Sequence, residues 1–215
     1  MFMTDKFFVI GKAKARIVIV VSLVVIFCSN IVYASGGYDY GTPTGLNQLQ
    51  LDFTWNPFDV IEYGQSYLVW GYGITDYLDF HGFVSHSADN CNQIYGGFML
   101  CFFKSETLDL STAVGYRFID KYVDFDIPQL LYNYKFWDGY SIGGSIVSIN
   151  RDGKKNIGTA YDIAFFIPVG NYLELPSWVR SLHFGVGLFR PVTNAVYPTY
   201  SVDVKLVSLD QLFSK

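Results

Sequence analysis

The sequence predicts an all-β fold, an antiparallel up-and-down transmembrane β-barrel of about ten strands. In residues 107–118, large apolar side chains such as Leu108 and Phe118 alternate with polar ones such as Asp109 and Arg117. Successive side chains of a strand point to opposite faces, so this segment has one apolar and one polar face. The pattern recurs along the chain, which opens with an export-like segment. Together these features favour a barrel in a bacterial outer membrane, with apolar residues against lipid and polar residues in the lumen.

Residues 1–34 have the pattern of a secretory signal peptide. Four basic residues precede an apolar run over 17–28, and small residues surround a cleavage site after Ala34. An uncleaved anchor helix is the alternative. It is disfavoured because Ser29 and Asn30 interrupt the run before it reaches the roughly 20 apolar residues that a spanning helix needs.

After cleavage, we expect residues 35–45 to form an N-terminal periplasmic segment and residues 46–215 to form the barrel. The net charge of the mature chain would be −7, which disfavours nucleic acid as a partner. Cys91 and Cys101 would survive cleavage without metal-site spacing, so we expect no metal and no cofactor. Two unlinked thiols are the simpler expectation for this pair, and a disulfide is the alternative.

Five alternating segments make up the first half of the barrel. The first ends at Asn56-Pro57, because proline cannot donate to a strand ladder. Polar or turn-forming residues separate the others, such as those at 74–76 and 104–106. The expected strands are 46–55, 67–73, 77–86, 93–103 and 107–118.

Five further segments complete the barrel. An acidic loop around 120–126 precedes them, and Asp138-Gly139 is a strong hairpin signal within them. The expected strands are 129–136, 140–150, 157–167, 182–190 and 200–207. An even count puts both chain ends on the periplasmic side, and the loops 56–66, 87–92, 119–128, 151–156 and 190–196 on the outer side. Eight strands is the alternative count.

A soluble secreted β-barrel that binds a ligand would also alternate, with its apolar face turned inward. Two features favour lipid outside instead. The faces opposite the large apolar residues are rich in glycine, alanine and serine, which suit the inside of a narrow cylinder. Charged residues make up only 16% of the chain, against about a quarter in soluble proteins.

The hairpin Tyr72-Gly73-Ile74-Thr75-Asp76-Tyr77-Leu78-Asp79-Phe80 resembles those of small outer-membrane barrel proteins of Gram-negative bacteria. The stretch Asp79-Phe80-His81-Gly82-Phe83 is also similar to a segment of the nucleoside-specific outer-membrane channels. The resemblance implies a barrel and a location in the outer membrane. It implies no functional residue.

The face assignment predicts a polar network in the lumen, made of Asp52, Asp79, Asp109, Arg117, Lys135, Asp162, Asp203 and Lys205. Lone charges in a narrow barrel are costly to desolvate, so we expect them to pair. Asp52 should approach Asp203 and Lys205 where the first and last strands meet, and Asp109 should approach Lys135. Phe83, Phe103, Phe166 and Phe189 are expected to narrow the bore.

We therefore expect a narrow pore for small solutes or a structural membrane protein, with outer-membrane lipid around it. The alternative is a barrel enzyme that modifies outer-membrane lipid, for which His81, Ser85 and Asp79 supply the residue types of an activated nucleophile. His81 and Ser85 lie about 13 Å apart along one strand, too far for a direct hydrogen bond. No catalytic residue is therefore assigned.

Overall fold

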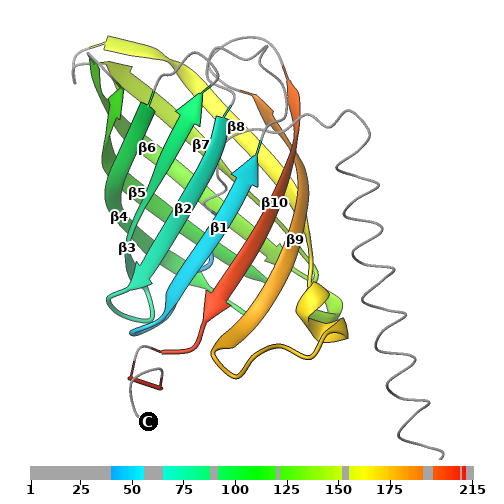
Figure 1. Ribbon diagram of the computed structural model, residues 1–215. Helices are drawn as coiled ribbons and strands as arrows, with labels where there is room; N and C mark the ends of the chain where they lie inside the picture. Colours follow the sequence, from blue (N-terminus) through cyan, green and yellow to red (C-terminus); the bar gives the residue numbers. More distant parts are fainter. Residues whose placement is uncertain are drawn as a thin grey trace, which may run out of the picture.

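The computed structural model describes residues 40–55, 65–87, 92–119, 122–151, 155–190, 196–208 and 210–211. Its ten strands form one closed antiparallel barrel (Figure 1). Each strand pairs with its neighbours in the sequence, and β1 (Leu49–Trp55) pairs with β10 (Tyr197–Leu206) to close the cylinder. The prediction of a ten-stranded up-and-down barrel is confirmed, and the alternative of eight strands is wrong.

The remaining strands follow in chain order around the barrel. They are β2 (Gln65–Gly73), β3 (Leu78–Ser87), β4 (Asn92–Lys104), β5 (Leu108–Ile119), β6 (Tyr122–Lys135), β7 (Ser141–Arg151), β8 (Lys155–Ile167) and β9 (Val179–Arg190). Two short 3-10 turns, η1 (Trp137–Gly139) and η2 (Val169–Tyr172), connect strands. Within the described ranges, no helix combines the length and the apolar character needed to cross a membrane. The expected signal peptide and Cys91 lie outside the described residues, and Cys101 is a buried free thiol.

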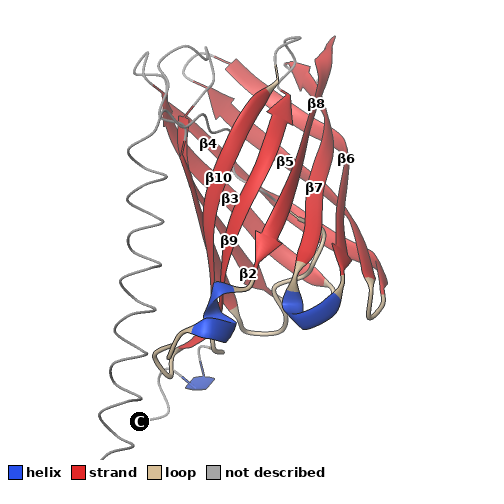
Figure 2. Cartoon of the chain, turned by 90° about the vertical axis from the view of Figure 1, so that its right-hand side faces the viewer, coloured by secondary structure: helices blue, strands red, loops and turns tan. Residues whose placement is uncertain are grey.

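β1 begins and β10 ends at the same end of the barrel, the lower end in Figure 1. The short connections over 74–77, 105–107 and 136–140 lie at this end, and Figure 2 shows η1 and η2 there too. We call it the turn end. Short turns are typical of the periplasmic side of outer-membrane barrels, so we expect the turn end to face the periplasm.

The outer wall of the barrel is apolar and its interior is polar. Along β5, Asp109 and Ser111 are fully buried whereas Tyr116 and Phe118 are each 54% exposed. Exposed apolar side chains of this kind occur on strands all around the barrel, among them Phe53, Leu68, Phe80, Ile94, Phe98, Val114, Leu130, Ile146, Ile163 and Leu188. A soluble barrel has the opposite arrangement, with its apolar residues inside. The apolar wall therefore faces lipid, and the strands span the membrane.

Aromatic side chains gather at the turn end. Trp137, Tyr172 and Trp178 are each at least half exposed, at 72%, 55% and 50%. Trp137 contacts Phe136 and Tyr140, with ring centroids 5.0 and 6.4 Å apart. Tryptophan and tyrosine favour the boundary between lipid and water, so this cluster marks the periplasmic surface of the membrane.

Two expectations about the strands are wrong. β6 begins at Tyr122 rather than at residue 129, because Asp124 and Asp126 point into the lumen and continue the alternation that we had assigned to an acidic loop. A break in the β5–β6 and β6–β7 registers after Asp126 hides this continuity in the sequence. Phe103 does not face the lumen. A register shift after Cys101 turns it outward, where it is 49% exposed.

The lipid-facing assignment predicts the effect of a charge at the middle of β4. Phe98 is 50% exposed on the outer wall. Phe98→Arg should lower the free energy of unfolding in lipid vesicles by about 2–4 kcal/mol, because the charge meets hydrocarbon. Phe98→Leu should change it by less than about 1.5 kcal/mol. Urea titration of the two variants measures the difference, and equal stabilities would contradict the assignment.

Candidate functional site

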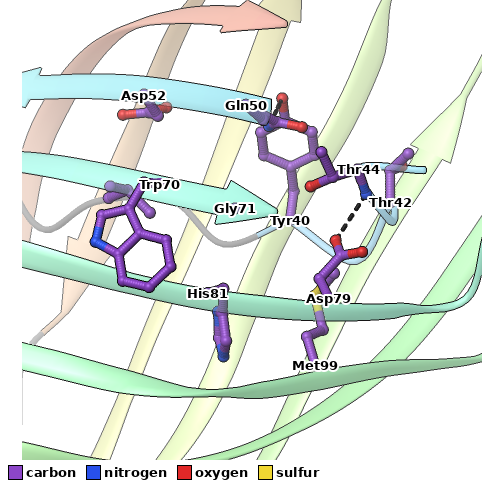
Figure 3. Close-up of a pocket in the computed structure, with 11 residues that line it drawn as sticks. Tyr40, Thr42, Thr44, Gln50, Asp52, Trp70, Gly71, Asp79, His81 and Met99 are labelled. Atoms are coloured by element: carbon purple, nitrogen blue, oxygen red, sulfur yellow. Dashed lines mark hydrogen bonds between the residues drawn. The ribbon is translucent and has the colours of Figure 1, made fainter. Parts of the chain in front are cut away.

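The barrel interior holds a piece of the chain itself. Residues 40–45, which we call the lumen segment, run along the inner wall before β1 begins (Figure 3). The Tyr40 ring packs on buried Phe166 at 4.5 Å between centroids. Gly41 lies so close to the backbone of Leu131 in β6 that a Cβ atom there would collide with it. The expectation that residues 35–45 lie in the periplasm is therefore wrong for the described part, residues 40–45.

Three buried carboxylates of the wall each accept a hydrogen bond from the lumen segment. The Tyr40 hydroxyl donates to Asp203 Oδ2. Thr42 Oγ1 donates to Asp109 Oδ2 at 2.8 Å, and the Thr44 backbone N–H donates to Asp79 Oδ2 at 2.7 Å. Asp79, Asp109 and Asp203 are at most 1% exposed. The segment thus supplies neutral donors to carboxylates that would be costly to leave unsatisfied in this position.

The wall also donates to the segment. Gln50 Nε2 donates to the Tyr40 hydroxyl at 2.7 Å, and Asn133 Nδ2 donates to Thr42 Oγ1 at 2.7 Å. Ser111 Oγ donates to the carbonyl oxygen of Gly41 at 2.6 Å, and Lys205 Nζ donates to that of Pro43 at 3.3 Å. The hydroxyls of Tyr40 and Thr42 therefore donate and accept at once, and the segment is held from β1, β5, β6 and β10.

The predicted lumen charges around the segment meet in two groups. Lys135 Nζ lies 2.9 and 3.0 Å from the two oxygens of Asp109 and also donates to the carbonyl of Ser105. Asp52 lies opposite Asp203 in the β1–β10 register and accepts a hydrogen bond from Thr54 Oγ1 at 2.6 Å. Lys205 is two residues beyond Asp203 on the same strand and contacts the segment rather than Asp52.

The other predicted lumen charges lie away from the segment. Arg117 pairs with Asp126, with 2.6 Å between guanidinium and carboxylate, and its guanidinium lies 5.5 Å from the centre of the Phe83 ring. Asp162 accepts hydrogen bonds from the backbone N–H and the hydroxyl of Ser145, at 2.7 and 2.6 Å. These contacts fix neighbouring strands to one another.

The residues considered for an enzyme do not form a nucleophile and base. Asp79 holds the lumen segment, and Figure 3 shows its carboxylate turned toward Thr44. The His81 ring approaches the Tyr95 hydroxyl, with 3.2 Å between Nε2 and the oxygen. Ser85 is buried four residues further along β3, about 13 Å from His81. The described residues also contain no cluster of His, Cys, Asp or Glu that could hold a metal ion.

Two cavities adjoin the segment. A vestibule of about 400 Å³ is lined by Glu106, Lys135, Phe136, Phe166, His183, Asp203 and Lys205 together with Tyr40 and Thr42. Several of its residues belong to the turn-end connections, so it adjoins the periplasmic mouth. A second cavity of about 20 Å³, room for about one water molecule, lies beside Asp52, Asp79 and His81 (Figure 3). Tyr40 and Thr42 of the segment line both cavities.

Sequence reasoning identified the wall carboxylates but missed their partners. Nothing in the spacing of Tyr40, Thr42 and Thr44 distinguishes a segment inside a barrel from an exposed linker. The only available signal was the composition of residues 36–45, which hold no long aliphatic side chain and several glycines. Asp126, which pairs with Arg117, was expected in an acidic loop.

The fold and the lumen define a class: a transmembrane β-barrel of the bacterial outer membrane that carries part of its own chain inside. No family model and no curated protein matches the sequence. Among solved structures, the chain is similar to the KdgM porin in complex with disordered oligogalacturonate, at 8% identity and a TM-score of 0.44, over 74% of this chain and 98% of that one.

Larger proteins are also similar. Acinetobacter baumannii OccAB4 matches at 12% identity and a TM-score of 0.29, over 72% of this chain and 56% of its own. Pseudomonas aeruginosa OccK11 (OpdR) matches at 7% identity and a TM-score of 0.30, over 74% of this chain and 66% of its own. At identities this low, no functional residue can be transferred from these proteins to this chain.

The Asp109–Lys135 pair predicts a measurable coupling. Lys135→Met should lower the free energy of unfolding by about 2 kcal/mol, because Asp109 stays buried without its cation. Asp109→Asn should lower the free energy of unfolding less when Lys135→Met is already present than when it is made alone. The difference between these two losses, the coupling, should be at least about 1 kcal/mol. A double-mutant cycle in urea measures it. Lys104→Met, which removes an exposed contact to the Asp76 carbonyl, is the control and should change stability by less than about 0.5 kcal/mol.

Proposed function

We propose that this protein is a narrow outer-membrane pore for small solutes, and that the lumen segment closes it. The single observation that carries the proposal is the occupied lumen: residues of the chain's own N-terminal region lie inside a polar bore, where they line both the vestibule at the turn end and the small inner cavity. A barrel with a purely structural role would gain more from an interior filled by side chains.

The contacts of the segment suit a reversible plug. Apart from the Tyr40 ring on Phe166 and the buried Pro43, the described contacts of the segment with the wall are hydrogen bonds. Water can replace such bonds when the segment leaves, so the net free energy that holds it is much smaller than the sum of its contacts. A segment that packed aliphatic side chains into the wall would not exchange in this way.

The expected signal cleavage fits the same proposal. Cleavage after Ala34 would leave a free N-terminus only five residues before Tyr40. A free end can enter or leave a lumen without threading a closed loop through it. The lumen segment would then be tethered at one side only, where it joins β1 at the turn end.

Outer-membrane lipid is the second proposed partner, through the apolar wall described above. The lipid-modifying alternative has no comparable support, because Asp79 is engaged by the segment and His81 and Ser85 are separated along β3. The experiment described next would also identify a structural protein that transports no solute.

Removing two hydroxyls of the segment should open the pore. In the double variant Tyr40→Phe and Thr42→Val, the wall carboxylates lose two donors while the shape of the segment is kept. Each lost bond to a charged acceptor is worth about 1.5–3 kcal/mol, so the open fraction should rise at least tenfold for each substitution. Single-channel recording in planar bilayers measures the fraction of time in the conducting state.

The control makes the same chemical changes outside the lumen. Thr112 and Tyr132 lie on the outer face and donate to backbone carbonyls of Gln129 and Asp162. Thr112→Val with Tyr132→Phe should leave conduction unchanged. If a folded variant lacking residues 38–44 also fails to conduct, the protein is not a pore.

A further inference from the structure

We infer that the wall which holds the lumen segment is a solute site, and that it takes small organic cations rich in N–H and O–H donors in preference to anions. The inference rests on the proposed pore function, because the site becomes available only when the segment leaves. In the structure, the segment occupies it as an internal ligand, and the chemistry of that ligand shows what the wall accepts.

The segment meets the wall carboxylates with donors only. Asp203, Asp109 and Asp79 receive a phenol O–H, an alcohol O–H and a backbone N–H respectively. A solute that replaces the segment must supply donors at the same three places, or leave buried carboxylates without partners. An ammonium group carries three donors and a hydroxyl carries one, whereas an ionised carboxylate carries none.

The charges at the site favour a cation. Around the segment stand four carboxylates, Asp52, Asp79, Asp109 and Asp203, and two ammonium groups, Lys135 and Lys205. Lys135 is already paired with Asp109. The two lysines leave an excess of two negative charges in a confined space of low dielectric, where charge selects strongly between ions. Glu106 adds a further acid at the rim of the vestibule.

Two carboxylate oxygens are available beyond those that the segment uses. Asp79 Oδ1 and Asp203 Oδ1 are buried and accept no hydrogen bond from any described residue. Asp79 borders the small inner cavity and Asp203 borders the vestibule. A donor-rich cation can satisfy both oxygens, which the segment does not do. The site is therefore better matched to such a solute than to its internal ligand.

The vestibule gives this solute a route to the site. Its volume of about 400 Å³ is that of about a dozen water molecules at roughly 30 Å³ each. Aromatic rings of Phe136, Phe166 and Tyr40 line it beside the charged groups. Rings of this kind pack against the apolar face of a sugar while the charged groups take its polar edge. A monosaccharide-sized amine has both features.

Three sugars of nearly equal size test the preference. Liposomes that carry the full-length Tyr40→Phe, Thr42→Val protein are exposed to protonated glucosamine, to glucose and to glucuronate, and the influx rates are compared. Glucosamine should enter at least threefold faster than glucose, and glucuronate should be the slowest. In the same background, Asp79→Asn with Asp203→Asn should reduce the ratio of the glucosamine rate to the glucuronate rate at least threefold.

The matched control is Asp162→Asn, which removes a lumen carboxylate that does not contact the segment. It should leave the ratio within a factor of two. Heat-modifiable migration on a gel establishes that each variant is folded. Influx without a dependence on charge, or with glucuronate fastest, would overturn the inference while the pore function stands. No influx of any sugar into liposomes carrying the folded variant would instead remove the proposed function.

Discussion

Every backbone hydrogen bond of a chain in hydrocarbon must be satisfied within the protein, and the architecture follows from that constraint. Ten strands meet it by closing through the pairing of β1 with β10. Closure fixes which side chains face inward, and that face carries Asp52, Asp79, Asp109 and Asp203. Carboxylates enclosed in a narrow cylinder require donors. The two lysines nearby do not supply enough of them, and the lumen segment provides three more.

The segment and the wall are consequently interdependent. Without the segment, Asp79, Asp109 and Asp203 would depend on water for the hydrogen bonds that it donates. Without the carboxylates, the polar groups of Tyr40, Thr42 and Thr44 would lose the acceptors that they meet inside the barrel. Under the proposed pore function, a plug held in this way would exchange between the lumen and water. The same property distinguishes a gate from a permanent filling.

The sequence was sufficient to predict the barrel but not the lumen segment inside it. Alternation with period two identified ten strands, the outward position of Phe118 and the inward position of Asp109. It could do so because the apolar residues of each strand face lipid and its polar residues face the lumen. Bulges interrupt that alternation. One in β6 hid the start of that strand, and another in β4 reversed the expected side of Phe103. The lumen segment has no period at all. Its position depends on acceptors contributed by β3, β5 and β10, and such long-range complementarity cannot be read from six residues.

The direction of the segment also determines how the pore can be controlled. It joins β1 at the turn end, so that anchor stays in the periplasmic mouth whether the lumen is open or closed. The vestibule, with Lys205, His183 and Asp203 on its wall, lies at the same end. A solute in the vestibule therefore meets Tyr40, its carboxylate Asp203 and Thr42. Competition for Asp203 alone removes the bond that holds the aromatic residue of the plug. The residues that select the solute are then the same ones that release the segment, and selection and opening share one set of contacts.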